Sequence, residues 1–274
     1  MGTSASHKGA KSGVSFDPPW LDDIDVPNSP PEPQPEKKQS EEPASPPAPA
    51  VAPPARFGGA RRNMSDYVKT GSRDSLRRAL GHYSKTGMGG ASRVASRMQS
   101  STRVGAGMYS AFNALRSGAN QTLANELSKL QESGADAYSI IDAIVGYVCP
   151  DGGSLDEVST RDSVSAALSD LFQKNPDIDI TNLSDDNIWS LVSSFLGYEA
   201  FNRVQLDIGQ AFESMDSLGN RLARLNDMRE YLESEIAAQL NTLRKESAQK
   251  PPSDLQGIVR TAIERTFTVF EVAV

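Results

Sequence analysis

Cysteine and histidine are scarce in this sequence of 274 residues, which holds one cysteine, Cys149, and two histidines, His7 and His82. A single cysteine excludes an intramolecular disulfide. Zinc sites and thiolate nucleophiles draw mainly on these two residue types, and the three residues stand far apart in the chain. We therefore expect no catalytic residue, no metal and no cofactor.

Long apolar runs are also missing. No stretch approaches the roughly 18 apolar residues of a membrane-spanning helix, and the amino terminus lacks the apolar core of a secretory signal. Phosphate-binding glycine motifs are incomplete, since Gly9–Ser12 lacks the Gly-Lys-Ser/Thr order. We expect a cytoplasmic protein that binds no nucleotide by itself.

Proline divides the chain, because 13 of the 17 prolines lie in residues 1–55, where large apolar side chains are rare. Such a segment cannot bury enough surface to offset the entropy of ordering its backbone, so we predict a disordered tail over these residues. It is rich in Gly and Ser and then in Pro, Glu and Ala. The aromatic and aliphatic island Phe16–Ile24 is either a docking motif or a chance cluster. Its candidate partner contacts are Phe16, Pro18, Pro19 and Trp20.

Charge is segregated along the chain, although the net charge is only −7. Residues 1–55 carry four Lys and eight acidic residues, and residues 56–103 carry eleven Lys or Arg and two acidic residues. Residues 104–274 carry thirteen Lys or Arg and twenty-five acidic residues. A basic block between two acidic ones indicates either internal neutralisation or a polyanionic partner. The candidate contacts to a partner or to nucleic acid are Arg56, Arg61, Arg62, Arg77, Arg78, Arg93 and Arg97.

The remaining sequence has helical apolar spacing from about Asn63 onward, and no useful alternating strand pattern precedes Phe267. Two short helices are predicted to end at Gly71 and Gly87, each after a lysine in its last turn. A longer helix is predicted over residues 91–116.

Helix caps divide the second half of the chain. Ser159–Asp162 fits a capping box that starts a helix, and Ser184 precedes another amphipathic run. Leucine and isoleucine then recur from Leu218 to Leu243 with coiled-coil-like spacing, which predicts one long amphipathic helix. Ser253 is predicted to cap the last helix.

Together these patterns predict an all-α protein. We expect the disordered Pro-rich tail over 1–55, a basic segment of short helices over 56–103 and an acidic helical bundle over 104–270. Within the bundle, Arg203 and Asp207 stand four residues apart and are predicted to form an ion pair. An exposed pair of this kind contributes only about 0.3 to 0.5 kcal/mol.

Several segments of the sequence, taken in order, match the features of one known family. They are Met1–Gly9, Pro18-Pro19-Trp20, the Pro/Glu/Ala spacer, Ala55–Arg62, Leu80–Tyr83, Gly87–Ala91 and Phe201–Gly209. In these the chain resembles the QatB family, the second protein of the Qat (QatABCD) anti-phage defence system. The resemblance covers the tail and most of the globular part, and its motifs are more specific in the first hundred residues.

The resemblance implies a bacterial operon in which this protein acts with a P-loop ATPase (QatA), a QueC-like enzyme of 7-deazaguanine chemistry (QatC) and a TatD-like nuclease (QatD). Catalysis would then lie in the partners. QueC-like enzymes of defence operons resemble ones that join a deazaguanine base to the N-terminal glycine of a protein partner, and Gly2 is the matching position. We expect a non-enzymatic subunit whose tail docks on, or is modified at Gly2 by, the QueC-like partner. The alternative is a nucleic-acid-binding subunit that recruits the nuclease through residues 56–103.

Overall fold

The computed structural model describes residues 55–149, 155–215, 217–247 and 254–274, and the regular structure of these residues is entirely helical, with no strand. The predicted all-α class is confirmed. The predicted tail lies outside the described residues except for its last residue, and so do Gly2 and the Phe16–Ile24 island. No helix within the described ranges is both long and apolar enough to cross a membrane.

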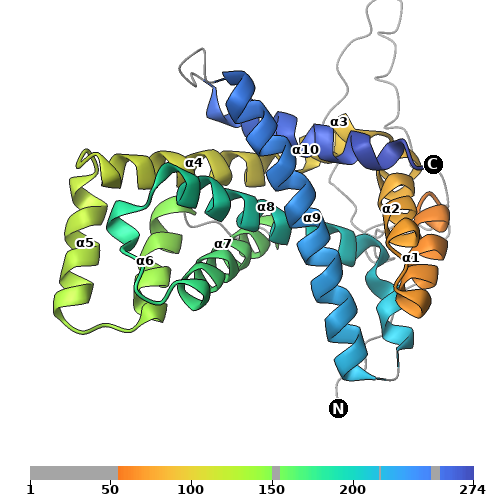
Figure 1. Cartoon of the computed structure of the whole chain (residues 1–274), viewed down its shortest axis with the longest axis horizontal. Coiled ribbons are helices and arrows are strands. Elements are labelled where there is room, and N and C mark those ends of the chain that lie inside the picture. Colours follow the sequence, from red (N-terminus) through yellow and green to blue (C-terminus); the bar gives the residue numbers. More distant parts are fainter. Residues whose placement is uncertain (1–54, 150–154, 216, 248–253) are drawn as a thin grey trace, which may run out of the picture. The chain divides into compact units, whose positions relative to one another are not determined.

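The helices follow one another through short connections, as Figure 1 shows. The first four are α1 (Gly58–Thr70), α2 (Arg73–His82), α3 (Ala91–Arg97) and α4 (Gln99–Arg116). They are followed by α5 (Gln121–Glu132), α6 (Ala137–Val148), α7 (Leu155–Lys174), α8 (Asp185–Ile208), α9 (Leu218–Ser247) and α10 (Leu255–Glu271). Short helices of other types are the π-helix η2 (Tyr83–Met88) and the 3-10 helices η3 (Ile180–Asn182) and η4 (Gly209–Ser214).

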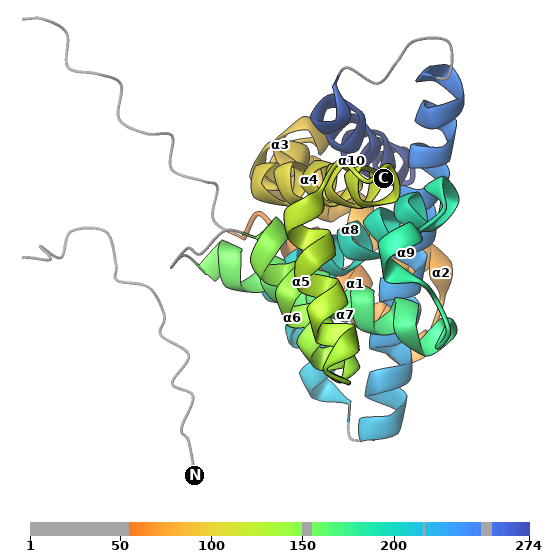
Figure 2. The same ribbon diagram turned by 90° about the vertical axis from the view of Figure 1, so that its left-hand side faces the viewer.

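The central helix of this unit is α8, whose residues 191–197 are all buried. A helix that is buried on every side needs neighbours on every side, and these are α4, α7 and α9. Figure 1 shows α9 crossing in front of α8, and Figure 2 shows α5, α6 and α7 side by side. Glycine permits the closest approach, because a Cβ on Gly197 would stand 2.7 Å from the Cβ of Glu233 on α9.

The last helix, α10, packs across α2, α3, α4 and α9, so the C-terminal residues complete the core of the N-terminal helices. Phe267 and Phe270 of α10 are fully buried. Gly81 of α2 faces this helix, and an added Cβ there would stand 2.5 Å from the carbonyl oxygen of Phe270. The basic segment 56–103 is thus packed on the rest of the unit through α10 and α8.

Local capping chemistry predicted some helix ends correctly. Gly71 follows α1 with a φ of 70°, and Ser184 caps α8 through its side chain. The long helix predicted from Leu218 is confirmed as α9. The predicted stop at Gly87 is wrong, because this residue lies within η2 and Gly89, with a φ of 82°, follows the π-helix.

Three other predicted boundaries are wrong. The run 91–116 is broken at Met98, whose φ of −94° and ψ of 27° leave the helical region and separate α3 from α4. α7 begins ahead of the Ser159–Asp162 box. α10 is capped by the side chain of Asp254, while Ser253 lies outside the described residues. The helix α5 has no counterpart among the predicted ones.

Candidate functional site at the Asp207 junction

Side chains from four helical segments meet around Asp207, in the last turn of α8. The hydroxyl of Tyr83 donates to Asp207 Oδ2 at 3.1 Å, and Arg97 Nη1 lies 3.2 Å from the same oxygen. Arg61 Nη2 donates to the main-chain oxygen of Asp207 at 3.2 Å. We call these four residues the Asp207 junction. It links α1, η2 and α3 to α8, with separations of 110 to 146 residues along the chain.

Electrostatics favour these contacts. Arg61 binds a carbonyl in the last turn of α8, where the negative end of the helix dipole favours a cation. Burial, followed by the charge of Asp207 and its hydrogen bond, raises the pKa of Tyr83 well above its ordinary value. The phenol therefore stays protonated at neutral pH and remains a donor to the carboxylate.

Glycines beside the junction permit close packing of aromatic rings. Phe57 stacks on Tyr83 with ring centroids 5.7 Å apart. The Phe57 ring fills the space above Gly87, where an added Cβ would stand only 2.4 Å from it. A Cβ on Gly59 would stand 3.1 Å from the ring of His82. The Gly-rich segments that carried the family resemblance thus converge here with the C-terminal turns of α8, and His82 has a packing role.

The predicted ion pair between Arg203 and Asp207 is wrong. Asp207 pairs with Arg97, and Arg203 Nη2 lies 4.0 Å from Glu199 Oε2, on the preceding turn of the helix. Sequence spacing places Arg203 within reach of both acidic residues. Only the position of α3, which brings Arg97 to Asp207, decides between them.

The seven candidate arginines divide into two groups. Four make side-chain contacts within the described unit: Arg61, Arg77 and Arg97 contact residues distant in the sequence, and Arg56 lies over the ring of its chain neighbour Phe57. Three are exposed, and their side chains form no hydrogen bond, ion pair or ring contact within the described ranges: Arg62, Arg78 and Arg93. Binding of a partner by any of the seven stays a prediction.

Internal neutralisation of the basic segment is partial. Its ion pairs with later acidic residues, as far as the structure describes them, are Arg97 with Asp207 and Arg73 with Asp227, whose Nη2 and Oδ1 are 3.3 Å apart. Tyr67 reinforces the second pair by donating to Asp227 Oδ2 at 2.9 Å. Acidic residues of α8 and α9 thereby fix the position of the N-terminal helices.

A second polar cluster, which the sequence did not reveal, surrounds Glu199 in the middle of α8. This carboxylate is fully buried and accepts hydrogen bonds from Ser101 of α4 and, on α7, from Thr160 at 3.3 Å and Ser163 at 2.8 Å. Arg203 adds a cation at 4.0 Å. Because a buried charge is costly unless it is paired and hydrogen-bonded, this cluster fixes α4, α7 and α8 in one arrangement.

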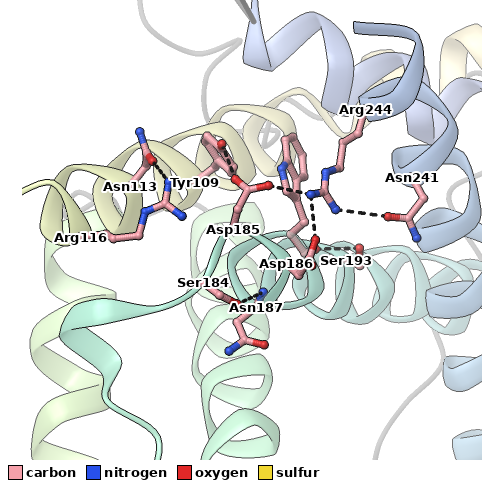
Figure 3. Close-up of polar contacts among 11 residues, drawn as sticks. Tyr109, Asn113, Arg116, Ser184, Asp185, Asp186, Asn187, Ser193, Asn241 and Arg244 are labelled. Atoms are coloured by element: carbon pink, nitrogen blue, oxygen red, sulfur yellow. Dashed lines mark hydrogen bonds and ion pairs between the residues drawn. The ribbon is translucent and has the colours of Figure 1, made fainter. Parts of the chain in front are cut away.

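A third polar cluster joins the N-terminus of α8 to α4 and α9 (Figure 3). Arg244 Nη2 lies 2.6 Å from Asp185 Oδ2 and 2.9 Å from Asp186 Oδ1. Tyr109 donates to Asp185 Oδ1 at 2.7 Å, and the Arg244 guanidinium lies 5.5 Å from the Trp189 ring centroid. Acidic side chains at three levels of α8 therefore hold its neighbours in place.

The single thiol lacks the exposure and the lowered pKa of a reactive cysteine. Cys149 is buried, and burial raises the pKa of its thiol to about 11, so it is protonated at neutral pH. Arg161 Nη1 donates to the carbonyl oxygen of Cys149 at 2.9 Å, a contact that joins the end of α6 to α7. In the parts of the chain that the structure describes, no three His, Cys, Asp or Glu side chains are grouped as metal ligands.

Comparison with known proteins bears on this architecture. Residues 89–270 match the family described as "Qat anti-phage system associated protein QatB". No curated protein and no solved structure matches the chain. The matched range runs from the residue after η2 almost to the end of α10, and it includes all four acidic residues of α8. The chain belongs to the QatB family, and its role lies in anti-phage defence.

Proposed function

We propose that this protein is a non-enzymatic subunit of a cytoplasmic anti-phage complex. It acts with a QatA-like ATPase, a QatC-like enzyme of the QueC family and a QatD-like nuclease. Its N-terminal segment docks on the QueC-like enzyme, which modifies the chain at Gly2. The family match supports the defence role. The resemblance of the first hundred residues supports the partners and the modification.

The observation that carries this proposal is the way in which the described body begins. Ala55 has a φ of 59°, and the amide of Gly58 donates to its carbonyl oxygen at 2.7 Å, so the chain turns sharply ahead of α1. Phe57 is then buried against Tyr83. The 54 residues before this turn span at most about 190 Å when extended, at about 3.3 to 3.6 Å per residue. A segment of that length, anchored at the turn that begins with Ala55, can bring Gly2 to an active site on a separate protein.

Glycine is chemically suited to the N-terminal end of this segment. Removal of Met1 frees the amine of Gly2, and this amine is the group available for conjugation at the chain end. Glycine has no Cβ, so its amine enters a narrow active site without a steric clash.

A Gly2→Glu variant tests the proposal in cells that carry the whole operon. Glutamate at the second position prevents removal of Met1, so the reactive amine is never formed, and we expect phage protection to be lost. Gly13→Glu is the matched control, because it adds the same charge to the same segment without altering the chain end, and it should protect like the parent. Circular dichroism should show an unchanged helical body in both variants. Full protection by Gly2→Glu would contradict the proposal.

Binding of nucleic acid is the second candidate function, favoured by the exposure of Arg62, Arg78 and Arg93 without partners in the described ranges. Release of counterions would make such binding fall steeply between about 50 and 200 mM salt. Joint reversal of these three charges to glutamate should abolish it, whereas Arg77 and Arg97 hold internal contacts and are unsuitable for this test. Salt-sensitive binding of a DNA duplex that the triple variant loses would favour this candidate over the first. Absence of such binding would reject it.

A further inference from the structure

Leu206 is the most exposed large apolar residue within the described ranges, with 81% of its surface open to solvent. It nevertheless belongs to α8, whose neighbouring apolar residues Val204 and Ile208 are fully buried. A single exposed leucine is ordinary on a protein surface, so its surroundings decide whether it has a role.

Those surroundings are cationic. The next residue, Asp207, binds Arg61 through its carbonyl oxygen and Arg97 through its carboxylate. A guanidinium has five N–H donors on three nitrogens, and these contacts engage one nitrogen of each arginine, Nη2 of Arg61 and Nη1 of Arg97, which also contacts the sulfur of Met88. The Arg97 side chain is 38% exposed. Leu206 is therefore the chain neighbour of the residue that holds both arginines, and both arginines retain unused donors.

We propose that Leu206, Arg61 and Arg97 form a docking surface for an acidic peptide that carries bulky apolar side chains. Charge complementarity selects an acidic partner, because within the described unit Arg97 pairs with one carboxylate, that of Asp207, and Arg61 binds only a main-chain carbonyl oxygen. Arginine is enriched at protein interfaces, and an exposed apolar side chain gains free energy when a partner removes it from water. A phosphate backbone would use the arginines but would leave Leu206 without an apolar contact, which favours a peptide over nucleic acid.

This inference concerns the described body and does not depend on the modification of Gly2. A suitable probe is a fluorescent synthetic peptide with the sequence of residues 16–25, which combines four aspartates with Phe16, Trp20, Leu21 and Ile24. The binding partner in the assay is the full-length protein with Trp20→Ala, Asp22→Asn and Asp23→Asn. These substitutions prevent its own residues 16–25 from competing with the peptide.

Fluorescence anisotropy should show saturable binding that weakens between 50 and 200 mM salt, since charge contributes to it. Leu206→Asp should weaken binding at least tenfold, because it removes the apolar anchor and adds a like charge. Leu218→Asp is the matched control, an identical substitution at a leucine of α9 that is 66% exposed, and it should bind like the parent. A peptide with serine at its four apolar positions should bind at least tenfold more weakly.

Three results would overturn the proposal. The first is no saturable binding of the peptide, and the second is equal binding by Leu206→Asp and the parent. The third is binding of a DNA duplex that Leu206→Asp abolishes, which would assign this surface to nucleic acid. Because Leu206 is exposed, circular dichroism should show that Leu206→Asp and Leu218→Asp are folded alike.

Discussion

Replacing Glu199 by leucine should destabilise the helical body severely. The carboxylate is fully buried and binds the hydroxyls of Ser101, Thr160 and Ser163, with Arg203 at 4.0 Å. All four partners are themselves buried. Leucine would remove the acceptor that these groups share, and with it the acceptor of a fourth, half-buried hydroxyl, that of Ser159 at 3.4 Å.

The magnitude follows from the cost of removing a buried charged acceptor. Removing one partner of a buried ion pair costs about 3 to 5 kcal/mol, and each stranded hydroxyl adds up to about 1 to 3 kcal/mol unless it finds another acceptor. Ser163 also donates to the carbonyl oxygen of Ser159 at 2.9 Å, which limits its loss. We therefore expect Glu199→Leu to lower the free energy of unfolding by about 4 kcal/mol. Glu199→Gln keeps the shape and one acceptor oxygen, and should cost about 1 to 2 kcal/mol.

Thermal and urea unfolding followed by circular dichroism measure these differences. For a body of this size, about 1 kcal/mol shifts the midpoint temperature by about 2 to 4 °C, so Glu199→Leu should melt at least about 8 °C below the parent. Glu126→Leu on α5 is the matched control, since Glu126 is exposed and its replacement should change stability by less than about 0.5 kcal/mol. A Glu199→Leu variant as stable as the parent would refute the reasoning that this carboxylate holds α4, α7 and α8 together.

Three further predictions concern packing, titration and the third polar cluster. Gly87→Ala should lower the free energy of unfolding by about 1 to 3 kcal/mol, because its Cβ would displace the Phe57 ring. In the control Gly107→Ala the added Cβ meets open space, and stability should rise by up to about 1 kcal/mol. Equal melting temperatures of the two variants would contradict this prediction. The Cys149 thiol, with its pKa raised from 9.0 to about 11, contributes stability that is complete below pH 9 and lost as the pH rises through 11, so Cys149→Ala should show a smaller fall in stability over that interval. Arg244→Ala should lower the unfolding free energy by about 1 to 3 kcal/mol, and a urea-measured loss below about 0.5 kcal/mol would argue against its ion pairs.

The sequence predicted what local chemistry controls. Glycine at position 71 adopts the left-handed conformation that ends a helix, and Ser184 accepts a hydrogen bond from the first turn of α8. Leucine and isoleucine spacing predicted α9 because most of the apolar stripe from Leu225 onward is packed against the core. These signals lie within a few residues of the structure that they specify.

The candidate site depends on residues that are distant from one another in the sequence, so it could not be predicted from sequence patterns alone. Tyr83 and Asp207 are separated by 124 residues, and Ser101 and Glu199 by 98. Serine, tyrosine and a lone acidic residue are too common for such pairs to be recognised without the packing of the helices. The family resemblance drew attention to the Gly-rich segments. The structure explains why one of them needs glycine, because the Phe57 ring occupies the space that a Cβ on Gly87 would fill.

The mass of the protein's N-terminal peptide tests the central claim most directly. The chain is purified from cells that carry the whole operon, and from cells in which the active site of the QueC-like partner is disabled. The account predicts that a fraction of the peptide begins at Gly2 and carries an added mass localised to that residue, and that this addition disappears with the disabled partner. The account would be contradicted if the cells with the active partner were fully protected against phage and yielded only an unmodified N-terminal peptide.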